Sequence, residues 1–314
     1  MSAKILSDDE FVAAFKLAKS PARMAELYGY DIRSIYKRRR TLEKKLEISL
    51  PSNDTVNIQK HSARINLEIE NGTFIVFSDA HFWDTAPTTA FRALIKFIKE
   101  LKPKLVVNNG DAFDGASISR HGRIGFLEKK PSVIEELKAC VEMLSQIEKA
   151  SKGAILTWPW GNHDQRFESY LAAVAPQYEF VDGFHLKDHF PKWRPCWATW
   201  INDSICIKHR YKGGVHATHN NTVGSGVSIF TGHLHSPKVT PYSDYNGTRY
   251  GVDSGTLANC DGGQFMYTED NPKNWRSGFA IGTIWNGQLL PPELVQVFNE
   301  DEGLITFRGE VIKV

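Results

Sequence analysis

Five short apolar runs between residues 74 and 235 each end in acidic, amide or imidazole side chains. The endings are, in chain order, Asp79-Ala-His81, Gly110-Asp111-x-x-Asp114, Gly161-Asn162-His163-Asp164, His209, and Gly232-His233-x-His235. Apolar runs of four to six residues that alternate with amphipathic stretches are typical of buried strands in an α/β sheet. Such sheets bind their ligands outside the carboxyl ends of the strands. We therefore expect these side chains to gather at one edge of the fold.

The order of elements changes along the chain. The pattern first predicts strands that alternate with helices, at 74–77, 86–101, 105–108, 131–149 and 153–158. After residue 195 it predicts strands in closer succession, at 198–200, 204–208, 227–230, 248–256 and within 278–314. This indicates a β-α-β-α-β half followed by a more antiparallel half, and so an α/β fold.

The side chains at these strand ends suit divalent metal ions. Carboxylate, amide and imidazole ligands favour manganese, iron, zinc or cobalt over the metals that prefer a set of thiolates. A carboxylate such as that of Asp111 can bridge two ions that lie roughly 3.5–4 Å apart. The glycines before Asp111, Asn162 and His233 allow tight turns at the strand ends.

The five blocks, in this order over residues 79–235, resemble the motifs of the calcineurin-like metallophosphoesterase superfamily. The resemblance implies a four-layer α-β-β-α sandwich of mixed sheets across residues 64–314. It also implies hydrolysis of phosphoesters by a metal-bridging hydroxide, held between two divalent ions. Manganese is the expected metal, with iron, zinc, cobalt and nickel as alternatives.

The same resemblance assigns a role to each residue. It implies a first metal bound by Asp79, His81 and His235. It implies a second metal bound by Asn162, His209 and His233, with Asp111 as the bridge. It makes His163 the proton donor or transition-state stabiliser, oriented by Asp164, and makes Asp114 a support for a metal-bound histidine.

The fourth block departs from the family pattern, which often has a glycine after the histidine. Here Arg210 follows His209, and His216 and His219 come soon after as alternative ligands. We favour His209 because it directly follows the apolar run 204–208.

Three further residues are candidates for contact with a substrate phosphate: Arg120, His121 and Arg166. Arginine can bind a phosphate through two parallel hydrogen bonds. Each of the three has the alternative of a solvated surface position. Trp158 and Trp160 are expected to pack in the core, with base stacking as the alternative.

Residues 1–48 carry a separate pattern of three short helices, of which the third is strongly basic. The pattern resembles helix-turn-helix modules and predicts a small all-α unit that docks on nucleic acid, DNA above all. The docking candidates are Arg33, Lys37, Arg38, Arg40 and Lys44. The alternative is a solvated basic helix that packs on the main domain. The polar stretch 49–63 is expected to be a linker.

Composition excludes several classes of protein. With 41% hydrophobic and 24% charged residues the chain is an ordinary globular one, neither disordered nor fibrous. No apolar run approaches the roughly 18 residues of a membrane span. The acidic N-terminal stretch is unlike a secretory signal, and the four cysteines form no C-x-x-C pair. We expect a cytoplasmic protein with reduced thiols and no membrane partner.

The substrate is less constrained than the chemistry. The basic helices favour a DNA nuclease, of the kind that phage or bacterial DNA processing and DNA repair use. The alternatives are a phosphatase or phosphodiesterase acting on small molecules or proteins, with structural N-terminal helices, and a non-catalytic DNA-binding adaptor.

Overall fold

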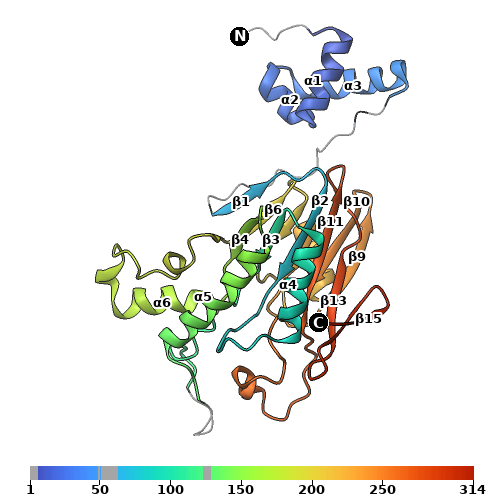
Figure 1. Ribbon diagram of the computed structural model, residues 1–314. Helices are drawn as coiled ribbons and strands as arrows, with labels where there is room; N and C mark the ends of the chain where they lie inside the picture. The colour runs from blue at the N-terminus through green and yellow to red at the C-terminus, as the bar shows by residue number, and fades with distance from the viewer. Residues whose placement is uncertain (1–5, 49, 51–62, 123–128) are drawn as a thin grey trace. The chain divides into compact units, whose positions relative to one another are not determined.

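The computed structural model describes residues 6–48, 50, 63–122 and 129–314 (Figure 1). The chain divides into two compact units, residues 1–59 and 60–314, and each is described by itself. The predicted linker 49–63 lies almost wholly outside the described residues. None of the described helices is both long enough and apolar enough to cross a membrane.

The first unit has three helices, α1 (Asp8–Ala18), α2 (Pro21–Tyr28) and α3 (Ile32–Leu46). Each begins at a residue whose side chain accepts backbone N–H bonds of the first turn: Ser7, Ser20 and Asp31. Their core contains Phe11, Phe15, Met24, Ile35, Leu42 and Leu50.

The apolar residues of α3 are only partly buried. Ile35 and Leu42 are buried, whereas Ile32, Tyr36 and Leu46 are between 36% and 40% exposed. The reason is geometric, because Tyr36 lies about 100° around the helix from Ile35. Ile32 and Leu46 are the first and last residues of α3.

The second unit contains two sheets. The larger has the order β15-β14-β13-β11-β2-β3-β4-β5, and β12 pairs with β11. Its strands are β2 (Gly72–Phe77), β3 (Leu105–Asn108), β4 (Ile155–Pro159), β5 (Arg194–Cys196), β11 (Gly278–Trp285), β12 (Gln288–Leu289), β13 (Glu293–Asn299), β14 (Leu304–Phe307) and β15 (Glu310–Lys313). Neighbours from β2 to β5 are parallel, and the rest are antiparallel.

The smaller sheet has the order β1-β6-β7-β8-β10-β9. Its strands are β1 (Arg64–Leu67), β6 (Ala198–Ile201), β7 (Ile205–Ile207), β8 (Ser228–Thr231), β9 (Lys238–Asp244) and β10 (Gly247–Asp253). The helices of this unit are α4 (Thr89–Leu101), α5 (Val133–Ala150), α6 (Asp164–Val174) and α7 (Ala217–Ser225), with short 3-10 helices η1 (Pro176–Tyr178), η2 (Leu186–His189) and η3 (Gly263–Thr268).

Alternating side chains of β2 show how the layers pack. Phe74 and Val76 face the smaller sheet, in a core shared with Ile207 and Phe230. Residues 75 and 77 point the other way, into the core beneath α4 and α5. Figure 1 shows these helices covering the outer face of the larger sheet, while α7 packs on β8, β9 and β10. The predicted four-layer α-β-β-α sandwich is therefore confirmed.

A buried glutamate on α5 holds the loop that follows β3. Glu136 is 0% exposed, and its carboxylate oxygens accept the backbone N–H groups of Gly115 and Ala116, each at 2.9 Å. Burial raises the pKa of Glu136 to about 8, and the negative charge of Asp114 adds to the increase. The residue thus fixes a loop next to the functional strand ends at an electrostatic cost.

This raised pKa predicts a pH-dependent stability. The folded protein retains a proton that the unfolded chain releases above its ordinary pKa of 4.5. The contribution of Glu136 is therefore fully present below pH 4.5 and is lost as the pH rises toward 8, by a few kcal/mol. We expect Glu136→Gln to be less stable than the wild type at pH 5, with a gap that narrows by pH 9. Urea unfolding across this range measures the gap.

The control is Glu142→Gln, a change at an exposed position of the same helix. This variant shows what the same chemical change does to stability at a surface position of α5. A gap between Glu136→Gln and the wild type that stays constant from pH 5 to pH 9 would contradict the assignment.

Candidate metal centre

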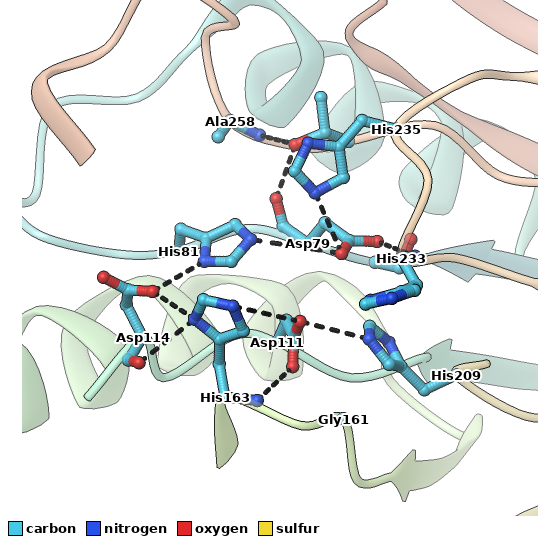
Figure 2. Close-up of polar contacts among 12 residues, drawn as sticks. Asp79, His81, Asp111, Asp114, Gly161, His163, His209, His233, His235 and Ala258 are labelled. Atoms are coloured by element: carbon cyan, nitrogen blue, oxygen red, sulfur yellow. Dashed lines mark hydrogen bonds and ion pairs between the residues drawn. The ribbon is translucent and has the colours of Figure 1, made fainter. Parts of the chain in front are cut away.

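The polar strand ends meet at one edge of the sandwich (Figure 2). Asp79 and His81 follow β2, and Asp111 follows β3 beside it. His209 follows β7 and His233 follows β8, in the other sheet. Parallel pairing within each sheet brings neighbouring carboxyl ends to the same edge, and packing of the two sheets brings the two edges together.

The first group of potential ligands is Asp79, His81 and His235, whose ligand atoms all lie within 4.8 Å of one another. Asp79 Oδ1 is 3.1 Å from His235 Nε2 and 3.9 Å from His81 Nε2. All three residues are buried. These are the three side chains that the sequence predicts for the first metal.

The second group is Asp111, His209 and His233. His209 Nε2 is 3.1 Å from Asp111 Oδ2, and its Nδ1 atom is 2.7 Å from the carbonyl oxygen of Asn109. That carbonyl can accept the Nδ1 proton, which leaves Nε2 free to bind a metal. Of the two alternatives, His216 precedes α7 and His219 packs against Tyr242. The geometry therefore favours His209 as the ligand.

Unsatisfied polar atoms show that these residues fit metal ions. Among the described residues, the buried atoms Asn162 Oδ1 and His81 Nε2 have no hydrogen-bond partner. A buried polar atom without a partner is costly unless another group occupies the site. Nitrogen and oxygen atoms of exactly this kind are ligands of divalent first-row metals. The residues present therefore suit a binuclear centre.

The charges of the cluster point the same way. Burial alone would raise the pKa of Asp79, but the imidazoles of His235 and His209 outweigh it and lower the pKa to about 2. Burial alone would lower the pKa of His209, but Asp111 and Asp79 raise it to about 10. Without metal, a proton on His209 thus balances the carboxylates. Metal binding would release that proton, because an imidazole ligand must be neutral.

Backbone strain is concentrated at these positions. Five of the predicted ligands have left-handed backbone, with φ between 41° and 73°: Asp79, His81, Asp111, His233 and His235. Few non-glycine residues adopt this conformation, and such residues cluster at active sites. The surrounding strands and glycines hold the strain.

Gly161 illustrates the crowding. A Cβ atom on Gly161 would lie 2.0 Å from Asp111 Oδ1. No side chain fits there while Asp111 keeps its position, so the glycine is required for close approach rather than for backbone freedom alone.

His163 lies beside both groups and is oriented by Asp114. Its Nδ1 atom makes a very short contact with Asp114 Oδ1, an oxygen that is also 3.1 Å from His81 Nδ1. His163 Nε2 is 3.9 Å from Asp111 Oδ2 and 3.2 Å from Arg166 Nη2. Burial lowers the pKa of His163, but Asp111 and Asp114 more than offset this and raise it. The expected support of a candidate metal-binding histidine by Asp114 is thus present, and Asp114 also contacts His163.

The expectation that Asp164 orients His163 is wrong. The carboxylate of Asp164 accepts the backbone N–H groups of Asp111, Phe113 and Gly161, and also Trp158 Nε1–H. Asp164 is the first residue of α6, and its side chain turns toward the base of the loops rather than toward the imidazole. Asp164 therefore shapes the loops, and Asp114 is the partner of His163.

The three substrate-contact candidates differ in position. Arg166 donates from Nη1 to the carbonyl of Asp114 at 2.8 Å and so lies at the site. Arg120 and His121 are exposed on a loop, and in the described part of the chain no hydrogen bond or ion pair joins either to the cluster. Trp158 is 1% exposed and packs on Phe190 and Trp193, which confirms core packing for it.

Several residues at the site were not predicted from the sequence. Trp83 Nε1 donates to Asp114 Oδ2 at 2.7 Å, and its place two residues after His81 was an available signal. Phe265 and Trp275 pack against the rings of His81 and His235. They come from a stretch without any recognisable motif.

Comparison with known proteins agrees with this geometry. Residues 72–249, more than half of the chain, match the calcineurin-like phosphoesterase family. The Gene 54 protein of Mycobacterium phage D29 is 28% identical over 233 residues, which cover 66% of this chain and 86% of that protein.

Three solved structures show distant similarity. Chaetomium thermophilum Vps29 has 11% identity and a TM-score of 0.38, over 77% of this chain and 95% of that one. The E. coli phosphoesterase YfcE has 13% identity and a TM-score of 0.32, over 70% of this chain and 97% of that one. A Saccharomyces cerevisiae protein serine/threonine phosphatase has 13% identity and a TM-score of 0.35, over 88% of this chain and 83% of that one. On the strength of the family match, the chain belongs to the calcineurin-like phosphoesterase family and is a metal-dependent hydrolase of phosphoester bonds.

Proposed function

We propose that this hydrolase is a manganese-dependent DNA nuclease that acts on phosphodiester bonds in the cytoplasm of a bacterial cell, in phage or bacterial DNA processing. The proposal rests on one combination of features. The chain has two groups of potential metal ligands beside His163, which Asp114 orients, and it also has a separate helical unit with an exposed row of cations. The metal centre supports cleavage of a phosphoester, and the cations favour a polyanionic substrate.

The roles at the metal centre follow from the ligand groups. Asp79, His81 and His235 would hold one ion, and Asn162, His209 and His233 would hold the other. Asp111, which belongs to the second group, would bridge the two ions. A bound pair of divalent ions supplies Lewis-acid activation of water and of the phosphate oxygens.

His163 serves as the proton donor to the leaving oxygen. Because Asp114 holds Nδ1, Nε2 is the ring atom that would carry the proton to the leaving oxygen. Arg166 lies beside that atom and can bind a phosphate oxygen through its guanidinium group. The carboxylate of Asp114 therefore acts through the histidine, as a positioning residue.

The cationic row lies on α3. Arg33, Lys37, Arg40 and Lys44 are exposed and spaced by four, three and four residues, so they share one face of the helix. Within the described part of the chain, no ion pair holds any of these four side chains. A row of this kind binds the phosphates of a nucleic acid with salt-dependent affinity.

Arg38 is different, because it supports the fold of the unit. Its Nη2 atom donates to the carbonyl of Leu6 and to Asp8 Oδ1, and its guanidinium lies over the ring of Phe11. We therefore leave Arg38 out of the proposed docking row.

The first test of the proposed function concerns the substrate. Purified protein with manganese should cut single- or double-stranded DNA, and removal of the metal with EDTA should abolish cutting. Asp111→Asn is the control, because it removes the carboxylate between the two groups. If the wild type hydrolyses p-nitrophenyl phosphate or a phosphopeptide but leaves both DNAs intact, the phosphatase alternative replaces the nuclease.

The second prediction separates the two aspartates. Asp114→Asn should lower kcat by ~10²-fold or more on a diester with a poor leaving group, and far less on a p-nitrophenyl ester, because a good leaving group needs no proton. Asp164→Asn should instead lower the free energy of unfolding by about 2–4 kcal/mol, with the dependence on leaving group unchanged. Leaving-group sensitivity in Asp164→Asn and not in Asp114→Asn would reverse the assignment.

The third prediction concerns docking. Replacement of Arg33, Lys37, Arg40 and Lys44 by alanine should weaken DNA binding and reduce the slope of log affinity against log salt by about 3–4. Hydrolysis of bis(p-nitrophenyl) phosphate should not change. The matched control replaces Lys99, Lys102, Lys149 and Lys152, four exposed lysines of the other unit. Equal losses of affinity in both quadruple variants, as measured by fluorescence anisotropy, would refute specific docking through α3.

A further inference from the structure

A group of three aromatic side chains lies against the first ligand group. Phe265, Tyr267 and Trp275, here called the aromatic wall, come from the segment that follows β10 and from η3 within it. The ring centroid of Trp275 is 4.6 Å from that of His235, and the centroid of Phe265 is 5.3 Å from those of His81 and His235. The wall therefore directly adjoins the metal-ligand side chains.

Within the wall, one ring anchors the other two. Phe265 is 2% exposed, and its centroid lies 5.1 Å from that of Trp275 and 6.4 Å from that of Tyr267. Tyr267 is 51% exposed, and its centroid is 6.4 Å from that of the partly exposed Trp275. Tyr267 and Trp275 are thus both partly exposed beside a buried support.

Tyr267 also lies within the electric field of the site. Burial raises the pKa of its hydroxyl, and the carboxylates of Asp114 and Asp79 add to the increase. Asp114 is the partner of His163, and Asp79 belongs to the first ligand group. Through Phe265 and Trp275, which contact His81 and His235, the ring of Tyr267 lies beside the first ligand group.

The segment that carries the wall also has contacts that hold it in place. Lys273 donates to the carbonyl of Cys260 at 2.6 Å, and its ammonium lies 5.8 Å from the Trp275 centroid. Half-exposed aromatic rings on a braced segment beside a reaction centre are positioned to bind a flat group.

We propose that Tyr267 and Trp275 stack a nucleobase next to the scissile phosphate, and so determine a preference for nucleoside phosphodiesters. The proposal rests on the proposed function, because it names the group that the same centre recognises. Stacking uses the π-face that every base has, so it selects for nucleotides without selecting a sequence. An alkyl phosphoester or a phosphoserine peptide offers no such face.

The test compares two diesters with the same leaving group. Thymidine 5′-(p-nitrophenyl phosphate) carries a base, and methyl p-nitrophenyl phosphate does not. With manganese, the wild type should have the larger kcat/KM on the thymidine ester. Tyr267→Ala should lose about five- to hundred-fold on the thymidine ester, mainly through KM, and little on the methyl ester. Trp275→Ala, which also removes a contact with His235, should lose more on the thymidine ester than on the methyl ester.

Two further variants distinguish stacking from a structural role. Tyr267→Phe keeps the ring and should retain the thymidine preference. Tyr245→Ala removes a fully exposed tyrosine at the β9–β10 turn and should change neither ester. Equal losses on both esters in Tyr267→Ala, or no loss on either, would overturn the stacking role while the phosphoesterase assignment stands.

A binding measurement covers the case in which neither ester is turned over, which would count against the proposed function. Titration with thymidine 5′-monophosphate and with deoxyribose 5-phosphate, followed by tryptophan fluorescence, compares affinity with and without the base. If the wild type binds thymidine 5′-monophosphate more tightly than deoxyribose 5-phosphate, and Tyr267→Ala removes this difference, the result would support the stacking role independently of catalysis. Equal affinities for the two ligands in the wild type would refute it.

Discussion

The position of the Asp111 carboxylate is the constraint on which the rest of the site depends. One oxygen accepts the backbone N–H of His163 at 2.8 Å, and the other lies 3.1 Å from His209 Nε2. The first of these partners follows a strand of the larger sheet, and the second follows a strand of the smaller sheet. A single side chain thus joins the two layers at the point where both ligand groups meet.

Keeping Asp111 there requires the architecture around it. Its backbone is left-handed with φ 56°, its N–H is bound by the buried Asp164, and Gly161 leaves room for its oxygen. The cost is a site in which buried carboxylates must be balanced by charged imidazoles. Divalent ions would replace these protons, because they supply positive charge next to carboxylates that are already buried.

Much of this was predictable from the sequence, because each polar block directly follows an apolar run. Parallel pairing of β2, β3 and β4 then brings Asp79, Asp111 and Asn162 to one edge, whatever the details of the loops. What failed depends on contacts between distant segments. Asp164 is next to His163 in sequence, yet the partner of His163 is Asp114. The side chain of Asp164 is directed instead by the backbone N–H groups of the loops, which donate to its oxygens. The aromatic wall could not be predicted for the same reason, since Phe265 and Trp275 reach the site through packing on His81 and His235, which are distant in sequence.

The central claim is that seven side chains from five strand ends hold two ions. A crystal grown with manganese and measured at the manganese absorption edge tests it most directly. The account predicts two anomalous peaks, one among Asp79, His81 and His235 and one among Asn162, His209 and His233, with Asp111 in contact with both. A map without a peak at either group, or with a single ion that leaves Asp111 unbound, would contradict it.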